Sequence, residues 1–310
     1  MRISFVTTIY RSAGAIAEFR RRAILAAQAI GCDYEVVLVN DASPDNGLEI
    51  ARELAEEDSK VSVIDLSRNF GQHRALWTGM AHATGDLVMI LDGDLEEDPM
   101  WAVTFHETMT SNRADVVYGV QESPKGSKVY RLGRNTFYRM LDALTTFNFP
   151  KDVTTARLMT RRYIDAIRLF EERELFLVGI MHVAGFSQIG VPVKKLSLSK
   201  TTYNYRKLIP LFLSSVTSFS VSPLFLIFIS GVVIFFTSLL FIALLVAAKL
   251  LGGIGVEGWI SVMAVVSLSL GLNVLVNGII AIYLATIFLE VKRRPLTIVR
   301  DVYRSDKEDT

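Results

Sequence analysis

Two aspartates in the stretch MILDGDLEEDP, residues 89–99, are the side chains whose type and spacing point most directly to chemistry. Asp92 and Asp94 follow an apolar run and are separated only by Gly93. Asp and Gly are common turn residues, so the motif could be a simple turn. Two carboxylates at the end of a buried strand also supply hard oxygen ligands for Mg²⁺ or Mn²⁺, and Mg²⁺ characteristically keeps waters and binds substrate phosphates. Asp92 and Asp94 are therefore candidate metal ligands.

Further acids follow other apolar runs of the chain. Asp41 comes after VVLVN (36–40), and Asp65 comes after VSVI (61–64). If these runs are parallel strands, the acids lie beyond the carboxyl ends, where α/β sheets bind ligands. Asp41 has an alternative role as a turn residue or as the N-cap of a helix expected over residues 47–57.

The elements that must position these acids alternate between strand-like and helix-like patterns. Short Val/Ile/Leu runs are separated by amphipathic stretches, which is typical of a parallel sheet covered on both faces. The expected strands span residues 2–9, 34–39, 61–66 and 86–91, and the expected helices span residues 13–30, 47–57 and 73–83. The sequence contains neither G-x-G-x-x-G after the first strand nor G-x-x-x-x-G-K-[ST] anywhere, which disfavours a dinucleotide oxidoreductase and a P-loop NTPase.

The second half of the chain contains two long uncharged stretches. Residues 223–248 are long enough to cross a bilayer core of about 30 Å, and a second uncharged run extends over 258–289. Lys and Arg residues cluster before the first stretch and after the second, so the positive-inside rule predicts that both termini are cytoplasmic. The segment 204–220 is expected to be an amphipathic helix in the membrane interface.

The composition narrows the function classes. Lys+Arg total 33 against 32 Asp+Glu, so no global basic field indicates a nucleic acid partner. Cys32 is the single cysteine, which excludes an intrachain disulfide and a multi-cysteine zinc site. Polar residues and Arg11 interrupt the first residues, so a cleaved secretory signal is not expected and the N-terminal part is expected in the cytosol.

The chain resembles family 2 glycosyltransferases of the GT-A fold, specifically the membrane-anchored polyprenyl-phosphate enzymes related to dolichol-phosphate mannose synthase. Several motifs in order carry the resemblance over nearly the whole chain. They are VNDASPDNG (39–47), LSRNFGQHRAL (66–76), LDGDLEEDP (91–99), ARLMTRR (156–162), YNYRKL (203–208) and EVKRRP (290–295).

This resemblance implies an α/β GT-A domain with a mainly parallel sheet, followed by an interfacial helix and two transmembrane helices. The expected parts are a cytoplasmic glycosyltransferase domain (1–203), the interfacial helix (204–220), a two-helix transmembrane region (221–290) and a cytoplasmic C-terminal tail (291–310). It implies an integral membrane protein, most consistent with a bacterial inner membrane.

The resemblance also implies a nucleotide-diphosphate sugar at the strand ends, with Asp41 near the base and the aspartate pair around the diphosphate and its Mg²⁺ or Mn²⁺. The residues expected to bind this donor are Tyr10, Asp41, Asp65, Arg68, Asp92 and Gly93. Where the family usually has Pro-x-Tyr-Asn-Glu after the first strand, this chain retains only Tyr10. A metal on the diphosphate would neutralise charge that develops as the nucleotide leaves.

The chain departs from its relatives at a proposed catalytic base. Relatives often have an aspartate where this chain has Thr155, and Asp152 is close in sequence but not aligned. A phosphate monoester has a second pKa of about 6 and is largely dianionic at neutral pH, so such an acceptor needs no base. We therefore expect direct in-line attack by a lipid phosphate on the sugar C1, with inversion. The catalytic candidates are Asp94, Arg157 and Asp152.

An acceptor phosphate requires cations near the membrane, and arginine offers forked donors to phosphate oxygens. The basic residues expected to bind it are Arg131, Arg134, Arg139, Lys200, Arg206 and Lys207, together with Arg157 in the retained ARLM motif. For each of them, anchoring at the membrane or a solvated position is an alternative role.

The sequence thus predicts transfer of a hexose from a nucleotide sugar, expected to be UDP-linked, to polyprenyl phosphate at the cytoplasmic membrane face. One alternative is an enzyme of the same fold that transfers the sugar to a lipid-linked glycan or polysaccharide. The other is a catalytically silent scaffold that lacks the usual base at position 155. Small residues such as Gly271 and Gly278 in the second uncharged stretch allow close helix approach, so a homo-oligomer is a further expectation.

Overall fold

Two predictions concern residues that the structure does not describe. One is the interfacial helix over residues 204–220. The other is the binding of the acceptor phosphate by Arg131, Arg134, Arg139, Lys200, Arg206 and Lys207. The structure is a computed structural model, and it describes residues 1–122, 152–172, 175, 177–195, 222–250 and 258–305. The chain divides into two compact units, one of residues 1–138, 149–207 and 294–310 and one of residues 139–148 and 208–293.

The first unit is built around one mixed sheet, whose described strands run in the order β7-β5-β6-β4-β1-β2-β3-β8. Strands β1 to β4 are mutually parallel where they pair, β6 is antiparallel to β4 and β5, and β8 is antiparallel to β3. The strand bounds are Arg2–Ile9 (β1), Asp33–Asn40 (β2), Val61–Leu66 (β3), Leu87–Leu91 (β4), Val116–Gln121 (β5), Val153–Thr160 (β6), Gln188–Val193 (β7) and Val299–Arg304 (β8).

The sheet reverses its winding direction at β1. The chain passes from β1 to β2 and β3 on one side and then returns to place β4 on the other side of β1. The carboxyl ends of β1 and β4 therefore form a topological switch point, the position where open α/β sheets bind ligands.

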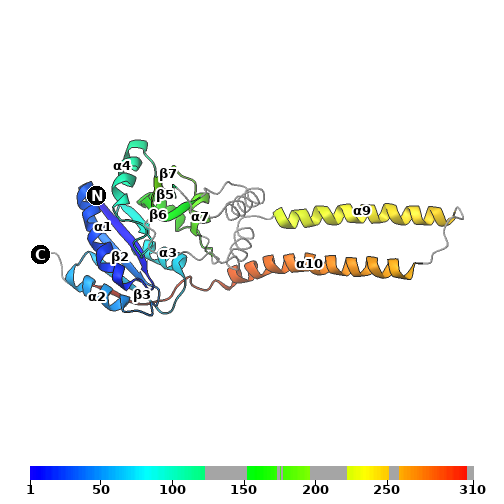
Figure 1. Ribbon diagram of the computed structural model, residues 1–310, viewed down its shortest axis with the longest axis horizontal. Coiled ribbons are helices and arrows are strands. Elements are labelled where there is room, and N and C mark those ends of the chain that lie inside the picture. Colours follow the sequence, from blue (N-terminus) through cyan, green and yellow to red (C-terminus); the bar gives the residue numbers. More distant parts are fainter. Residues whose placement is uncertain (123–151, 173–174, 176, 196–221, 251–257, 306–310) are drawn as a thin grey trace. The chain divides into compact units, whose positions relative to one another are not determined.

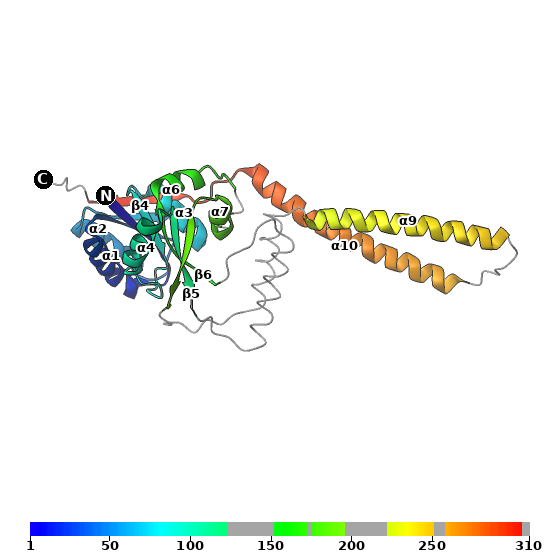
Figure 2. The ribbon, with the colours of Figure 1, turned by 90° about the horizontal axis from the view of Figure 1, so that it is seen from above.

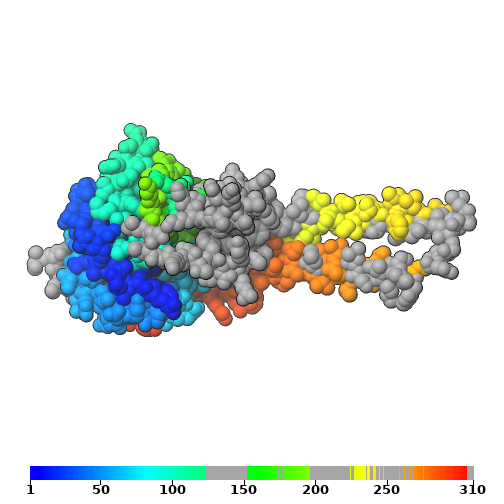
Figure 3. All heavy atoms as spheres, viewed as in Figure 1, coloured from blue at the N-terminus to red at the C-terminus, as the bar shows by residue number. Residues whose placement is uncertain are grey.

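Helices cover both faces of this sheet, as predicted (Figures 1 and 2). One face carries α1 (Ile16–Ile30), α2 (Gly47–Glu57) and α4 (Trp101–Asn112), and the other carries α3 (Gln72–His82), α6 (Arg161–Ile167) and α7 (Leu177–Val183). A short 3-10 turn, η1 (Ala13–Ala15), precedes α1. Figure 3 shows the surface of the chain in the view of Figure 1, on which the blue atoms of residues 1–60 and the teal atoms around α4 are visible.

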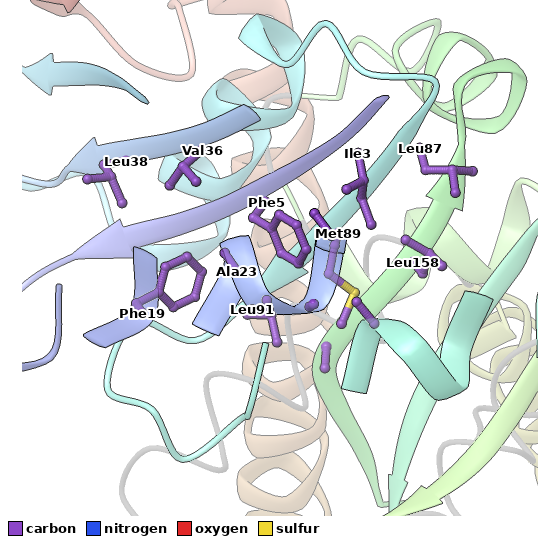
Figure 4. Packing of buried hydrophobic residues seen from close by; sticks show 14 of the residues in the cluster. Ile3, Phe5, Phe19, Ala23, Val36, Leu38, Leu87, Met89, Leu91 and Leu158 are labelled. Carbon is purple, nitrogen blue, oxygen red and sulfur yellow. The ribbon is translucent and has the colours of Figure 1, made fainter. Parts of the chain in front are cut away.

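The two covered faces explain why the central strands are buried along most of their length. Successive side chains of a strand point to opposite faces, so Phe5 packs in the core beneath α1 while Val6 packs beneath α3. Figure 4 shows Phe19 and Ala23 of α1 lying against this sheet, close to Phe5. A strand covered on both faces has no row of alternate side chains in contact with water, and β1, β4 and the second half of β2 are accordingly buried at consecutive residues.

Strand β8 was not predicted from the sequence. It lies in the segment 291–310, which was expected to be a tail, and it pairs along β3 at the sheet edge. The backbone N–H of Ser67 donates to the carbonyl of Ile298 at 2.9 Å, which extends the pairing past the end of β3. Residues 299–304, which follow both long helices in the sequence, therefore belong to the sheet of the first unit.

The second unit contains the two long helices α9 (Ser222–Leu250) and α10 (Trp259–Lys292), which lie side by side in Figures 1 and 2. Both uncharged stretches are thus helical, as predicted. Within the described residues, one segment, Ser269–Lys292, is long and apolar enough by length and composition to cross a membrane.

Candidate active site at the strand ends

The turn after β4 lies directly against the end of β1. The Thr7 hydroxyl donates to the Leu91 carbonyl at 2.9 Å, and a Cβ on Gly93 would stand 2.1 Å from the carbonyl oxygen of Thr8. A backbone oxygen this close cannot give way, so position 93 accepts only glycine without a shift of the turn. Gly93 therefore fixes where the aspartates on either side of it project.

The two aspartates of this turn have different surroundings. Asp92 accepts hydrogen bonds from the side-chain amide of Gln72 and from Lys195 Nζ, the latter at 3.2 Å. Asp94 is exposed, and its Oδ1 accepts the Glu96 backbone N–H at 2.9 Å. Burial of part of the carboxylate, with the negative charges of Asp92 and Glu96, raises the pKa of Asp94. Crowded acids of this kind attract a cation.

Glu97 and Lys195 also belong to this site, and sequence reasoning gave neither of them a role. Glu97 is fully buried, and Lys195 Nζ lies 2.7 Å from its Oε1 while also contacting Asp92. Burial and the charge of Asp92 raise the pKa of Glu97 to about 7. Burial works against the charge of Lys195, but Glu97 and Asp92 outweigh it and raise the lysine pKa.

Glu97 also contacts Thr155, the position at which the resemblance leads us to expect a catalytic base. Its Oε1 accepts the backbone N–H of Thr155 at 3.0 Å, and its Oε2 accepts the N–H of Asp92 at 3.2 Å. One buried carboxylate thus ties the acidic turn to the start of β6. Asp152 has φ of 58° and its carbonyl accepts the Gln121 N–H at 2.9 Å, so the backbone of Asp152 belongs to the turn before β6. Its catalytic role stays a prediction.

Arg157 is buried, with only 3% of the residue exposed. Its guanidinium lies over the Tyr118 ring at 5.5 Å. Burial lowers the pKa of Arg157, whereas Tyr163, Tyr118 and Glu97 favour its charged form. The charge of Arg157 also acts on His73, whose pKa is lowered first by burial and then by this arginine. Contact of Arg157 with an acceptor phosphate stays a prediction.

Asp41 anchors the loop before α3. Its carboxylate accepts the backbone N–H groups of Phe70 at 2.7 Å and Gly71 at 3.0 Å. Burial raises the pKa of Asp41, and these two hydrogen bonds oppose the shift. Gly71 has φ of 94°, a left-handed conformation that glycine adopts without strain.

The alternative of Asp41 as a helix N-cap is wrong. Helix α2 begins at Gly47 with Asn46 at the N-cap position, and Asp45 Oδ1 accepts the Gly47 N–H at 3.2 Å. Asp45, rather than Asp41, is therefore the aspartate that binds the backbone at the start of α2.

The remaining predicted donor residues also lie at this edge. Asp65 is buried and binds Asn40 and Arg300. Tyr10, directly after β1, is 45% exposed. Arg68 is exposed and lies over the Phe70 ring at 4.0 Å. The structure therefore brings the ends of β1 to β4 together, whereas ligand contacts of these side chains stay predictions.

A divalent metal would have few protein ligands here. No group of three or more His, Cys, Asp or Glu side chains suited to a metal occurs among the described residues. Asp92 and Asp94 nevertheless supply hard carboxylate oxygens on one turn, and Mg²⁺ is commonly held by one or two carboxylates with waters and substrate phosphates. The residues present fit such a site.

The mostly parallel mixed sheet, covered on both faces and carrying acidic turns at its switch point, defines a GT-A-like α/β fold. Residues 4–168, more than half of the chain, match the family described as glycosyl transferase family 2. The chain therefore belongs to glycosyl transferase family 2.

Individual relatives extend over both units. The chain is 40% identical over 306 residues to a protein of Mycobacterium tuberculosis named as a glycosyltransferase, covering 99% of this chain and 90% of that protein. It is 29% identical to the undecaprenyl-phosphate 4-deoxy-4-formamido-L-arabinose transferase of Edwardsiella ictaluri, covering 99% and 96%. Among solved structures it is similar to the mannosyltransferase PcManGT of Pyrobaculum calidifontis, with 16% identity, a TM-score of 0.42 and coverage of 94% and 86%.

Proposed function

We propose that this protein transfers a hexose from a UDP-linked sugar to polyprenyl phosphate at the cytoplasmic face of a membrane, with inversion at the sugar C1. The observation that carries the proposal is the acidic turn of Asp92 and Asp94 at the switch point between β1 and β4. The name of the Edwardsiella relative, an undecaprenyl-phosphate sugar transferase, supports a lipid phosphate as the acceptor class.

The donor would lie across the ends of the parallel strands. The loop anchored by Asp41 and the turn at Gly93 flank the ends of β2 and β4. We assign the base and ribose to the loops near Tyr10 and Asp41 and the diphosphate to the aspartate turn. Lys195 and Gln72 hold Asp92 in place at this turn.

Asp92 and Asp94 would hold Mg²⁺ or Mn²⁺ together with the diphosphate. When bound, the metal supplies Lewis-acid neutralisation of the charge that develops on the departing nucleotide. The raised pKa of Asp94 supports this assignment, because a neighbouring cation would relieve the crowding by Asp92 and Glu96.

The acceptor phosphate needs no base from the protein. One of its anionic oxygens forms the new bond to the sugar C1 while the bond from C1 to the diphosphate oxygen breaks. The electron pair of the broken bond leaves with the nucleoside diphosphate, and no proton is transferred. This chemistry agrees with a threonine at position 155, since a phosphate dianion is already nucleophilic at neutral pH.

The long helices supply the membrane part of the proposal. Residues 61–66 and 299–304 pair within one sheet, so the chain between them must cross any membrane an even number of times. If the apolar segment Ser269–Lys292 of α10 spans the bilayer, a second crossing is required, and we assign it to α9. Both termini then lie on one side, which we assign to the cytoplasm.

Purified full-length protein with labelled UDP-glucose or GDP-mannose, undecaprenyl phosphate and Mn²⁺ tests the proposal. Formation of a labelled lipid-phosphate sugar is the expected result. Product that forms only with a lipid-linked glycan or polysaccharide would favour the alternative in which the enzyme uses that acceptor instead of polyprenyl phosphate. Donor binding without any transfer would favour a silent scaffold, and both of these results would contradict the proposed acceptor chemistry.

A further inference from the structure

Strand β8 contains a bulge at Arg300. Asp65 pairs with Asp301 and Leu66 with Val299, so the register shifts and Arg300 is the extra residue at this step. Bulges re-aim a side chain and are over-represented next to active sites. Here the guanidinium Nη2 donates to the Ser67 carbonyl at 2.8 Å, and Nη1 lies 3.4 Å from Asp65 Oδ2.

Arg300 compensates a buried charge at the end of β3. The Asp65 side chain is only 2% exposed, and its other oxygen accepts the side-chain amide of Asn40 at 2.7 Å. Buried carboxylates require an opposite charge or full hydrogen bonding. The positive charge comes from a segment that follows both long helices in the sequence.

The chain of contacts continues into the loop after β2. Asn40 Oδ1 accepts the Ser43 N–H at 3.1 Å. The Ser43 hydroxyl accepts the Arg11 N–H at 2.7 Å and donates to Asp45 at 2.5 Å. Arg300 is thus linked, through Asp65 and Asn40, to the loop 41–45 and to the residue after Tyr10.

This loop holds a conformation that needs such support. Ala42 has φ of 50°, in the left-handed region that residues with a Cβ rarely adopt. Strained residues of this kind persist when surrounding contacts fix them, and they cluster at functional sites. The bond from Ser43 to Asn40 lies next to the strained residue.

We propose that Arg300 is a positioning residue for the donor site: by holding Asp65 and Asn40 in place, it fixes the loop 41–45 in the conformation that receives the nucleotide. The inference rests on the proposed function, because it assigns this loop to the nucleotide. According to this inference, strand β8 supports the donor site, although the sequence predicts only a tail in this segment.

The test compares Arg300→Ala, Arg300→Lys and a control, Arg304→Ala, in the full-length protein. Arg304 is an exposed arginine on the same strand, and it pairs with Ser62 at the opposite end of β3. One readout is hydrogen exchange of residues 41–47 without ligand. The other is the dissociation constant for UDP-glucose from calorimetry, together with KM and kcat for this donor.

For Arg300→Ala we expect faster exchange at the Ser43 amide and binding of UDP-glucose weakened by about tenfold, the size expected for losing one charge-assisted contact. KM should rise while kcat changes little. Arg300→Lys should lose less binding than Arg300→Ala, because one ammonium can contact Asp65 or the Ser67 carbonyl but not both at once. Arg304→Ala should resemble the wild type.

Unchanged exchange in Arg300→Ala would overturn the inference, as would faster exchange without weaker binding, or an equal effect of Arg304→Ala. If Arg300→Ala fails to fold, Asp65→Asn removes the same ion pair without leaving a buried charge. Because Asp65 is itself an expected donor residue, the deciding readout for this variant is faster exchange of residues 41–47 without ligand. Failure of the wild type to bind UDP-glucose or GDP-mannose would instead contradict the proposed function. The exchange measurement, which needs no ligand, would still show whether Arg300 holds the loop 41–45 in place.

Discussion

Lys195 has a central position among the charged residues of the site. Asp92 and Glu97 are both within ion-pair distance of its ammonium, at 3.2 Å and 2.7 Å. Glu97 is fully buried, and a buried carboxylate without a partner charge is strongly unfavourable. The lysine therefore stabilises the acidic turn in the form in which Asp92 and Asp94 can act together.

Replacement of this lysine should destabilise the first unit. Breaking a buried ion pair costs about 3–5 kcal/mol, and because Lys195 is partly exposed we expect a loss of about 2–3 kcal/mol in Lys195→Met. The matched control is Lys194→Met, because Lys194 is 84% exposed and lies 3.7 Å from Glu122. Chemical denaturation of the two variants checks this. Equal stabilities would show that the Lys195 contacts contribute nothing.

Gly93 allows a second prediction at the residue scale. Gly93→Ala would place a Cβ against the Thr8 carbonyl, so the turn must move and both aspartates with it. A displacement of about 1 Å can cost about 100-fold in rate, and we expect a loss of transfer activity of this size. Gly14→Ala is the control, since a Cβ there meets nothing within 4 Å. Similar transfer rates for the two variants would contradict the close packing of the turn.

The aspartate turn could be predicted from the sequence, whereas its partners could not. Asp92 and Asp94 directly follow a buried strand, so the local pattern alone places them at the ligand edge. Lys195 is about a hundred residues away along the chain, and its contact with Glu97 depends on β7 and β4 taking their places in one sheet. The long-range pairing that creates this contact leaves no periodic signal.

At the scale of the elements, Asp33 joins the starts of three neighbouring strands. Its carboxylate, at the beginning of β2, lies 2.9 Å from Arg2 of β1 and 2.6 Å from Lys60, which precedes β3. The hydrogen bond from Lys60, with a smaller one from Arg2, lowers the pKa of Asp33 to about 2 despite the opposing effect of burial.

This shift predicts an acid-sensitive contribution to stability. The folded-state pKa lies below the ordinary value of 3.8, so the stabilisation is complete above about pH 4 and is lost as the pH falls toward about 2. Asp33→Asn should lower the thermal midpoint at pH 6 and flatten its fall between pH 4 and pH 2. A variant with the same midpoint as the wild type at pH 6 would contradict the assignment.

The predicted and observed strands differ on both sides of β1 to β4, because β5, β6, β7 and β8 are not among the four expected strands. Strands β1 to β4 form where continuous apolar runs predicted them, because burial on both faces leaves a strong signal. Strand β8, VRDVYR, is mostly exposed and rich in charge. An edge strand buries little apolar surface, so its sequence resembles a polar tail and its pairing was missed.

At the scale of the whole molecule, the pairing of β8 with β3 constrains the topology. These strands share one sheet although α9 and α10 lie between them in the sequence. If the two-helix segment spans a membrane, as we propose, this pairing requires both of its ends to lie on the same side.

Cysteine labelling can test this topology. In a Cys32→Ser background, Asn112→Cys and Asp301→Cys place thiols at exposed positions of the first unit, and Gly253→Cys places one between the helices. A membrane-impermeant maleimide should label positions 112 and 301 from the same side and position 253 from the other. Labelling of all three from one side would contradict the two crossings.

The most direct test of the central claim is the metal dependence of transfer by the wild type and by Asp94→Asn. Purified protein, labelled UDP-hexose and undecaprenyl phosphate are assayed over a range of Mn²⁺ concentrations and with chelator. The account predicts that lipid-phosphate sugar forms only in the presence of the metal and that Asp94→Asn removes this activity at every concentration. Transfer by the variant, or by the chelated wild type, at the rate of the untreated enzyme would contradict it.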